Sequence, residues 1–104
     1  MTESALLIAS AEVLPGKEEE FNRWYNDHHI PEFGNKLPKV KTVRRYFSKR
    51  GSPSFIAIYE YGSFDDLKKS VTSRESRDAA ADADKQIGVL VKSFTYTSYD
   101  QIYP

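Results

Sequence analysis

The chain has 104 residues, which suits one domain with a single hydrophobic core and is too short for two. Its 15 basic and 15 acidic side chains cancel, so no net charge draws it toward nucleic acid or an anionic membrane surface. The lack of cysteine excludes disulfides and thiolate chemistry and is compatible with a reducing compartment. We therefore expect one cytoplasmic domain over residues 1–104, with neither nucleic acid nor membrane as partner.

The first apolar run, over residues 4–13, has the alternation of a strand. Leu7 and Ala9 fall on one face, and Leu6 and Ile8 fall on the other, so both faces begin apolar. No basic segment precedes this run, and it is too short to cross a bilayer, which favours a strand over a signal peptide or a membrane helix. We expect a central strand of a sheet.

A first helix is predicted to begin near Gly16. The acidic segment that follows suits the positive end of a helix dipole. The apolar stripe of this helix, spaced i, i+3, i+4 and i+7, contains Phe21, Trp24, Tyr25 and His28.

The same spacing puts His29 at the flank of the stripe, beside Tyr25. Pro31 is expected to end the helix, because its ring clashes with the carbonyl of Asp27 and pushes Ile30 out of the helical region.

Two further strands are predicted over residues 40–49 and 54–61, joined by a short turn as an antiparallel hairpin. The second strand carries Phe55 and Tyr59 on one face and aliphatic residues such as Ile56 on the other. Both of its faces are therefore expected to be buried.

A second helix is expected after Ser63, because Asp66 follows three residues later in the manner of a capping box. The charged, alanine-rich stretch over residues 73–84 has high helix propensity but little bulk. We predict a helix there that packs weakly or covers an edge. A last strand is predicted over residues 89–99.

This order of elements, βαββαβ, is that of the ferredoxin-like α+β folds. Right-handed connections then place the helices on one face of a four-stranded antiparallel sheet. The other face keeps apolar side chains that nothing in the chain covers, so a second copy is expected to bury it. The product would be a homodimeric α/β barrel, with the barrel interior and the crevice between helices and sheet as candidate pockets. The alternative is a monomer with a partly wet sheet.

Three segments of the chain share a pattern with known proteins: WYNDHHIPE over residues 24–32, LPKV over residues 37–40, and VRRY over residues 43–46. Together they resemble the EthD-like branch of the dimeric α/β-barrel superfamily. The histidine that recurs in this family precedes an Ile-Pro pair, so the resemblance assigns that position to His29. His28 stands where a polar or acidic residue is common, and Lys39 stands where glycine often follows the loop proline.

Relatives in this superfamily include monooxygenases that need no cofactor, lactone isomerases, polyketide cyclases and heme-handling enzymes. The resemblance thus implies a cofactor-free isomerase, cyclase or monooxygenase that acts on a small hydrophobic or aromatic metabolite. The alternative is a non-catalytic, small-molecule-binding or accessory homodimer with structural histidines.

His29 is the candidate proton-transfer residue, since imidazole titrates near neutral pH. Tyr25, one turn earlier, is its candidate catalytic partner, and either Tyr25 or a sheet tyrosine such as Tyr59 or Tyr46 would polarise a substrate oxygen. Further residues from the helix and the sheet are expected to contact the substrate: Trp24, His28, Tyr46, Tyr59 and Arg45. The alternative interpretation is structural, with a histidine capping helix carbonyls or buried in the core.

A metal site made of His28, His29 and Glu32 is the third interpretation. Adjacent histidines on a helix point about 100° apart, however, and Pro31 disturbs the i, i+4 relation of His28 and Glu32. We expect no metal. The arginines at 44 and 45 match the geometry of a carboxylate, although such a pair more often forms a solvated face and an ion pair.

Overall fold

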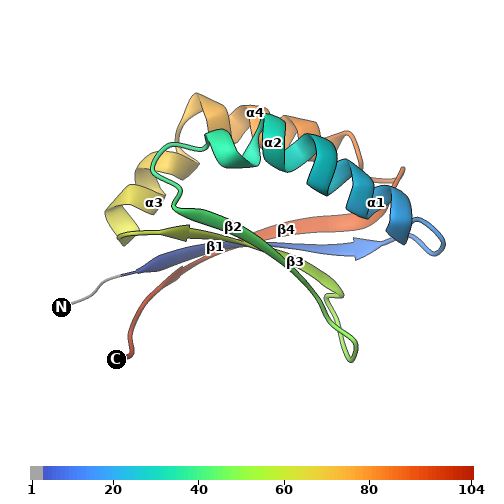
Figure 1. Ribbon diagram of the computed structural model, residues 1–104, viewed down its shortest axis with the longest axis horizontal. Coiled ribbons are helices and arrows are strands. Elements are labelled where there is room, and N and C mark those ends of the chain that lie inside the picture. The colour runs from blue at the N-terminus through green and yellow to red at the C-terminus, as the bar shows by residue number, and fades with distance from the viewer. Residues whose placement is uncertain (1–3) are drawn as a thin grey trace.

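The computed structural model describes residues 4–104 and confirms the predicted ferredoxin-like α+β order (Figure 1). No helix within that range is long and apolar enough to cross a membrane. The elements are β1 (Ala5–Val13), α1 (Glu18–Trp24), a π-helical turn (Tyr25–His29), α2 (Ile30–Glu32), a 3₁₀ turn (Gly34–Lys36), β2 (Thr42–Phe47), β3 (Phe55–Tyr61), α3 (Phe64–Val71), α4 (Arg74–Asp84) and β4 (Val91–Asp100).

The four strands form one antiparallel sheet in the order β2-β3-β1-β4. The first strand is central as predicted, with Ala9 opposite Ala57 of β3 on one side and Tyr96 of β4 on the other. All helices lie over one face of the sheet (Figure 1). The molecule therefore has two layers, and the core lies between them.

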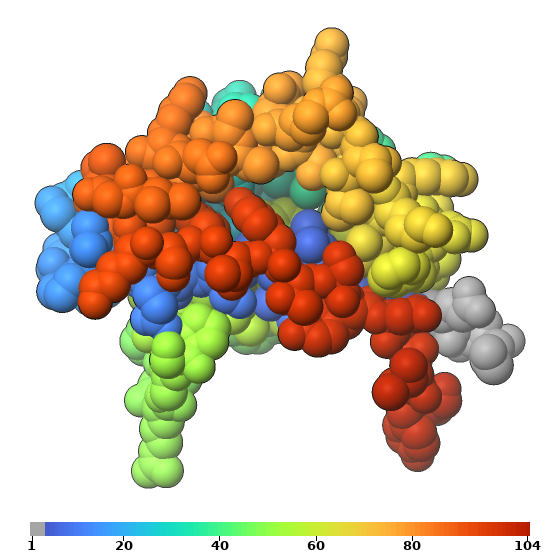
Figure 2. All heavy atoms as spheres, turned by 180° about the vertical axis from the view of Figure 1, so that it is seen from behind, coloured from blue at the N-terminus to red at the C-terminus, as the bar shows by residue number. Residues whose placement is uncertain are grey.

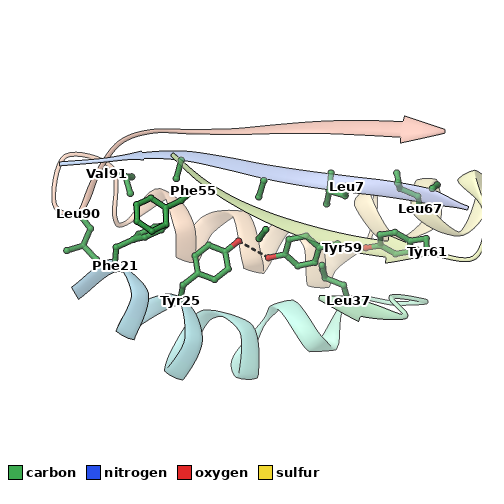
Figure 3. Close-up of a cluster of buried hydrophobic side chains, with 14 residues drawn as sticks. Leu7, Phe21, Tyr25, Leu37, Phe55, Tyr59, Tyr61, Leu67, Leu90 and Val91 are labelled. Atoms are coloured by element: carbon green, nitrogen blue, oxygen red, sulfur yellow. Dashed lines mark hydrogen bonds between the residues drawn. The ribbon is translucent and has the colours of Figure 1, made fainter. Parts of the chain in front are cut away.

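The core combines small residues of β1 with aromatic residues of β3 and α1 (Figure 3). Phe21 is fully buried and meets Phe55 edge to face, with ring centroids 5.2 Å apart. Burying a phenylalanine contributes about 1.5–3 kcal/mol. Because Ala9 and Ala57 are short, the aromatic rings can approach the sheet closely.

Pro31 does not end the first helical segment, contrary to the prediction. Ile30 keeps helical angles of φ −67° and ψ −51°, and the helix continues through α2. The turn before Pro31 is widened instead of broken, and this wider turn accommodates the missing backbone N–H of the proline. The Ile30 N–H donates to the carbonyl of Tyr25, five residues earlier, as in a π-helix.

The wider turn changes which histidine is buried. Phe21, Tyr25 and His29, spaced by four residues, now share the inward face, and His29 is only 4% exposed. The side chain of His28 is 48% exposed. The predicted stripe, with His28 at its centre and His29 at its flank, is thus wrong because an α-helical spacing does not hold across this turn.

The second helical region begins as predicted, since Ser63 Oγ accepts a hydrogen bond from the Asp66 N–H at 3.1 Å. Residues 73–84 form the predicted helix, and its buried residues lie near its C-terminal end. Ala83 is fully buried and Asp82 is 6% exposed, both on α4. The small residues Ser76, Ala79 and Ala80 line a space between this helix and the sheet.

The sheet face opposite the helices carries Leu6 and Ile8 of β1 and Ile56 and Ile58 of β3, all partly exposed. Figure 2 shows the β2–β3 hairpin, in green, and the C-terminal tail, in red, projecting from this side of the molecule. In that tail Ile102 is 94% exposed. An apolar face framed by two projections is thus open in the single chain.

Candidate active site

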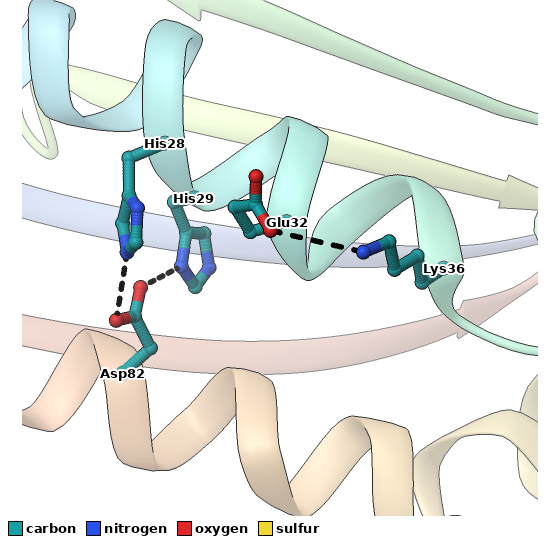
Figure 4. A network of polar contacts seen from close by, with 5 residues as sticks. All are labelled: His28, His29, Glu32, Lys36 and Asp82. Carbon is teal, nitrogen blue, oxygen red and sulfur yellow. Dashed lines mark hydrogen bonds and ion pairs between the residues drawn. The ribbon is translucent and has the colours of Figure 1, made fainter.

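His29 and His28 both contact one carboxylate, that of Asp82 on α4 (Figure 4). The distance from His29 Nδ1 to Asp82 Oδ2 is 2.8 Å, and the distance from His28 Nε2 to Asp82 Oδ1 is 3.1 Å. The first contact is buried and the second is half exposed. Asp82 thus joins the end of the first helical segment to a helix more than fifty residues later in the chain.

Burial lowers the pKa of His29 below its usual value of 6.5, although the hydrogen bond and the charge of Asp82 act in the opposite direction. Burial alone would raise the pKa of Asp82, but the hydrogen bonds and charges of the two histidines outweigh it and the pKa is lowered. Near neutral pH the His29 imidazole is therefore neutral, and Asp82 is ionised.

This charge state determines the tautomer of His29. The Nδ1–H donates to the Asp82 carboxylate, so Nε2 carries a free lone pair. Figure 4 shows the second ring nitrogen on the side of the imidazole that is turned away from Asp82. Within residues 4–104, Nε2 of His29 has no hydrogen-bond partner in the protein. A neutral imidazole oriented by a buried carboxylate is suited to accept a proton.

His29 lies at the wall of a cavity of about 270 Å³ between the helices and the sheet. Its polar lining consists of His29, Tyr59, Tyr96, Ser76 and Ser98. Its apolar lining consists of Leu7, Leu37, Val71, Ala79 and Ala80. Of the two predicted pockets, the structure thus contains the crevice between helices and sheet, and the alanines of α4 leave the space that forms it.

The hydroxyl groups of Tyr25 and Tyr59 are 3.0 Å apart and buried (Figure 3). Burial raises the pKa of Tyr25 and raises that of Tyr59 to about 12, so both are neutral phenols that can donate a hydrogen bond. Tyr59 lines the cavity directly, whereas Tyr25 is not part of the cavity lining and reaches Tyr59 through its hydroxyl group. A Cβ on Gly34 would lie 3.4 Å from the Tyr59 ring, so this glycine lets the ring and the backbone approach closely.

The other candidate contact residues lie outside the cavity lining. Trp24 stacks on the His29 ring, with centroids 4.6 Å apart at 26°, and thereby supports it from behind. Tyr46 is 51% exposed at the edge of the sheet. Arg45 Cζ lies 4.4 Å from the Tyr25 centroid, and its Nη1 donates to Asn26 Oδ1 at 2.9 Å. Burial lowers the pKa of Arg45.

The three residues weighed as metal ligands are not brought together. Glu32 pairs with Lys36 at 3.8 Å, while both histidines turn toward Asp82 (Figure 4). Across residues 4–104, no group of three or more His, Cys, Asp or Glu side chains has the geometry to hold a metal ion.

Sequence reasoning missed Asp82, and it assigned no part of the site to the helix that carries this residue. Four small residues, Ser76, Ala79, Ala80 and Ala83, follow the i, i+3, i+4, i+7 spacing of one helix face. That stripe was the available signal for the face of the helix that lines the cavity, and Asp82 borders it. Nothing in the sequence separates Asp82 from the neighbouring aspartates of the same segment.

No family profile and no curated protein sequence matches the chain. Solved structures do match it. An EthD-family protein from Bacillus halodurans has a TM-score of 0.74 at 19% identity, over 95% of this chain and 99% of that one. A DABB-family protein from Mesorhizobium loti has 0.68 at 10% identity, over 97% and 99%. A dimeric protein of unknown function from Bacteroides fragilis has 0.59 at 14% identity, over 94% and 96%.

The chain shares their fold. Two of the three are described as ferredoxin-like, and one as an EthD-family protein. The expected resemblance to EthD-like and other dimeric α/β-barrel proteins is thus confirmed in the fold, with an EthD-family protein among the structural neighbours. A shared fold leaves the reaction open, because sites on one fold support many chemistries.

Proposed function

We propose that this protein is an enzyme that moves a proton on a small hydrophobic or aromatic metabolite, with His29 as the general base. The observation that carries the proposal is the 2.8 Å contact between His29 Nδ1 and buried Asp82 at the wall of a cavity. Burial favours the neutral imidazole, and this contact fixes the tautomer whose free nitrogen, Nε2, is available for chemistry. The carboxylate would also stabilise the imidazolium that forms when the base accepts a proton.

The proposed step is removal of a proton from a carbon next to a carbonyl group. His29 Nε2 takes the proton, and the electron pair of the C–H bond moves to the carbonyl oxygen, giving an enolate. Tyr59 lines the same cavity and can donate a hydrogen bond to that oxygen. If Tyr25 donates its own proton to the Tyr59 oxygen, the Tyr59 proton is left for the substrate.

Isomerisation, cyclisation and oxygenation can all start from such an enolate, so the proposal includes all three reaction types. The cavity volume of about 270 Å³ lies just below the usual range for drug-sized ligands, about 300–1,000 Å³. A substrate with one or two rings fits that size. The apolar lining favours a substrate whose only polar groups lie near His29 and Tyr59.

Hydrogen–deuterium exchange at carbon tests the proposal without knowledge of the product. The protein is incubated in D₂O with a panel of cyclic ketones, lactones and phenols, and loss of C–H signal is followed by proton NMR. His29→Gln is expected to lower the exchange rate by about 10²- to 10⁴-fold. His28→Gln is the matched control, because it removes the exposed contact to Asp82 and leaves His29 intact.

Equal exchange by His29→Gln and the wild type would refute the role of His29. A non-catalytic binding protein, the alternative function, predicts that panel compounds bind without any exchange above the buffer rate.

We also propose that a second copy of the chain covers the open sheet face. An apolar strip on that face would otherwise be exposed to solvent. It consists of Leu6, Ile8, Ile56 and Ile58. The Bacteroides fragilis neighbour is described as dimeric, which supports the proposal by analogy. Light scattering is expected to give a dimer for the wild type and a monomer for Ile58→Lys. A monomeric wild type at micromolar concentration would refute it.

A further inference from the structure

A second hollow, the Arg45 groove, lies between the first helical segment and the outer edge of the sheet. Its volume is about 530 Å³, and its lining is Glu18, Asn22, Asn26, Arg45, Tyr46, Phe47 and Phe55. None of these residues lines the cavity beside His29. The groove is therefore a separate space, and Tyr25 contacts a lining residue of each: Arg45 of the groove through its ring and Tyr59 of the cavity through its hydroxyl group.

The guanidinium of Arg45 lacks a charge partner. Within residues 4–104, no Asp or Glu oxygen lies within 4.0 Å of it. Its Nη1 donates to Asn26 Oδ1, but its Nε is covered from solvent and has no acceptor. A cation that is partly withdrawn from water without a counter-charge favours binding an anion.

The walls beside Arg45 add the donors and the apolar surface that an organic anion needs. Because Asn26 accepts through Oδ1, its amide NH₂ group remains available as a donor. Asn22, one helical turn earlier, also lines the groove. Phe47 is 59% exposed and its ring centroid lies 5.0 Å from that of Phe55.

We propose that the Arg45 groove binds a small aromatic carboxylate. The planar guanidinium matches a carboxylate through two parallel hydrogen bonds, and a modest rotation of the side chain would give Nε the acceptor it lacks. The aromatic part of the ligand lies against Phe47, whose exposed ring otherwise faces water. Tyr25 holds the guanidinium in place from its other side.

Replacement of Glu18 provides a control that is expected to strengthen anion binding. Its carboxylate lines the groove and repels an anion, although it makes no ion pair with Arg45. Glu18→Gln is therefore expected to bind the anion more tightly than the wild type, by up to a few fold at low salt, since Glu18 is exposed and its charge is screened.

The experiment is an NMR titration of the full chain with benzoate as the probe and benzamide as its uncharged analogue. Benzoate is expected to shift the side-chain amide signals of Asn22 and Asn26 and the ring signals of Phe47. Benzamide is expected to bind at least about tenfold more weakly, because it lacks the charge that pairs with Arg45.

Variants separate this groove from the other possibilities. Arg45→Gln is expected to weaken benzoate binding at least about tenfold, and Arg45→Lys to weaken it less, since lysine keeps the charge but loses the planar fork. Arg44→Gln is the matched control, because the neighbouring arginine lies on the opposite face of β2 and lines neither hollow. His29→Gln is expected to leave the benzoate shifts in the groove unchanged.

The proposal would be overturned by the absence of a saturable shift of groove signals with benzoate, by equal binding of benzamide and benzoate, or by shifts confined to the cavity beside His29. Unchanged affinity in folded Arg45→Gln would do the same. If Arg45→Gln does not fold, the comparison with benzamide and the Glu18→Gln titration still test whether the groove binds the carboxylate, because both use a protein with Arg45 intact.

Discussion

Replacement of Asp82 by asparagine tests the link between α4 and the two histidines with little change in shape. The carboxylate accepts a buried hydrogen bond from His29 at 2.8 Å and a half-exposed contact from His28 at 3.1 Å. A bond to a charged group contributes about 1.5–3 kcal/mol and a neutral one about 0.5–1.5 kcal/mol. The substitution exchanges the first kind for the second, a loss of about 1–1.5 kcal/mol.

The contact from His28 adds less than about 1 kcal/mol, because its side chain is 48% exposed and water screens the charge. We therefore expect Asp82→Asn to lower the free energy of unfolding by about 1–2 kcal/mol. For a domain of this size that loss corresponds to a fall in Tm of about 5–15 °C.

Urea unfolding near neutral pH, followed by tryptophan fluorescence at one fixed protein concentration, measures the change. Asp78→Asn is the matched control, since Asp78 lies one turn earlier on the same helix and is exposed. If Asp82→Asn unfolds within about 0.5 kcal/mol of Asp78→Asn, the buried contact does not stabilise the fold and the reasoning fails.

Further perturbations test the pH dependence of His29 and the shape of the cavity. In the folded chain the pKa of His29 lies below its usual 6.5, so below that pH the unfolded chain binds more protons. The free energy of unfolding is therefore expected to fall as the pH drops below about 6.5. In urea unfolding at several pH values, His29→Gln should reduce this dependence on pH. The lowered pKa of Asp82 adds stability that is lost at more acid pH, below its usual value of 3.8, and Asp82→Asn should remove that later loss. Ala80→Leu should fill the cavity, raise stability by up to about 2 kcal/mol and abolish carbon-bound exchange; retention of exchange would place the substrate elsewhere. Gly34→Val should displace the Tyr59 ring and cost about 1–3 kcal/mol in thermal unfolding, whereas Gly34→Ala should be tolerated, because a single added carbon meets that ring at 3.4 Å.

The faces of the strands could be predicted because a strand has a simple period of two. Leu7 and Ala9 face the helices, while Leu6 and Ile8 lie on the open side, as their alternation indicates. The start of α3 at Ser63 could also be predicted from neighbouring residues, because the Ser63 hydroxyl group accepts a hydrogen bond from the backbone N–H of Asp66. Each of these features depends on neighbours within a few residues.

The exposure of the two histidines could not be predicted in this way. Helical spacing puts His28 on the inner face, but the missing N–H of Pro31 is accommodated by a π-helical turn that buries His29 instead. Whether a helix breaks, kinks or widens before a proline depends on what packs against it. Here Trp24 and Asp82 stabilise the widened turn, because both contact the His29 ring.

By itself, the sequence determined the order of the elements, the two-faced strands and the segment from Trp24 to Glu32 that holds both histidines, because local hydrogen bonding and side-chain periodicity govern these features. Only the tertiary structure decided which imidazole is buried against Asp82 at the wall of a cavity. That choice depends on Asp82, which comes from a distant helix, and on the small side chains of α4, which leave a cavity beside His29. Contacts between residues more than fifty positions apart have no periodic signal, so packing alone reveals them.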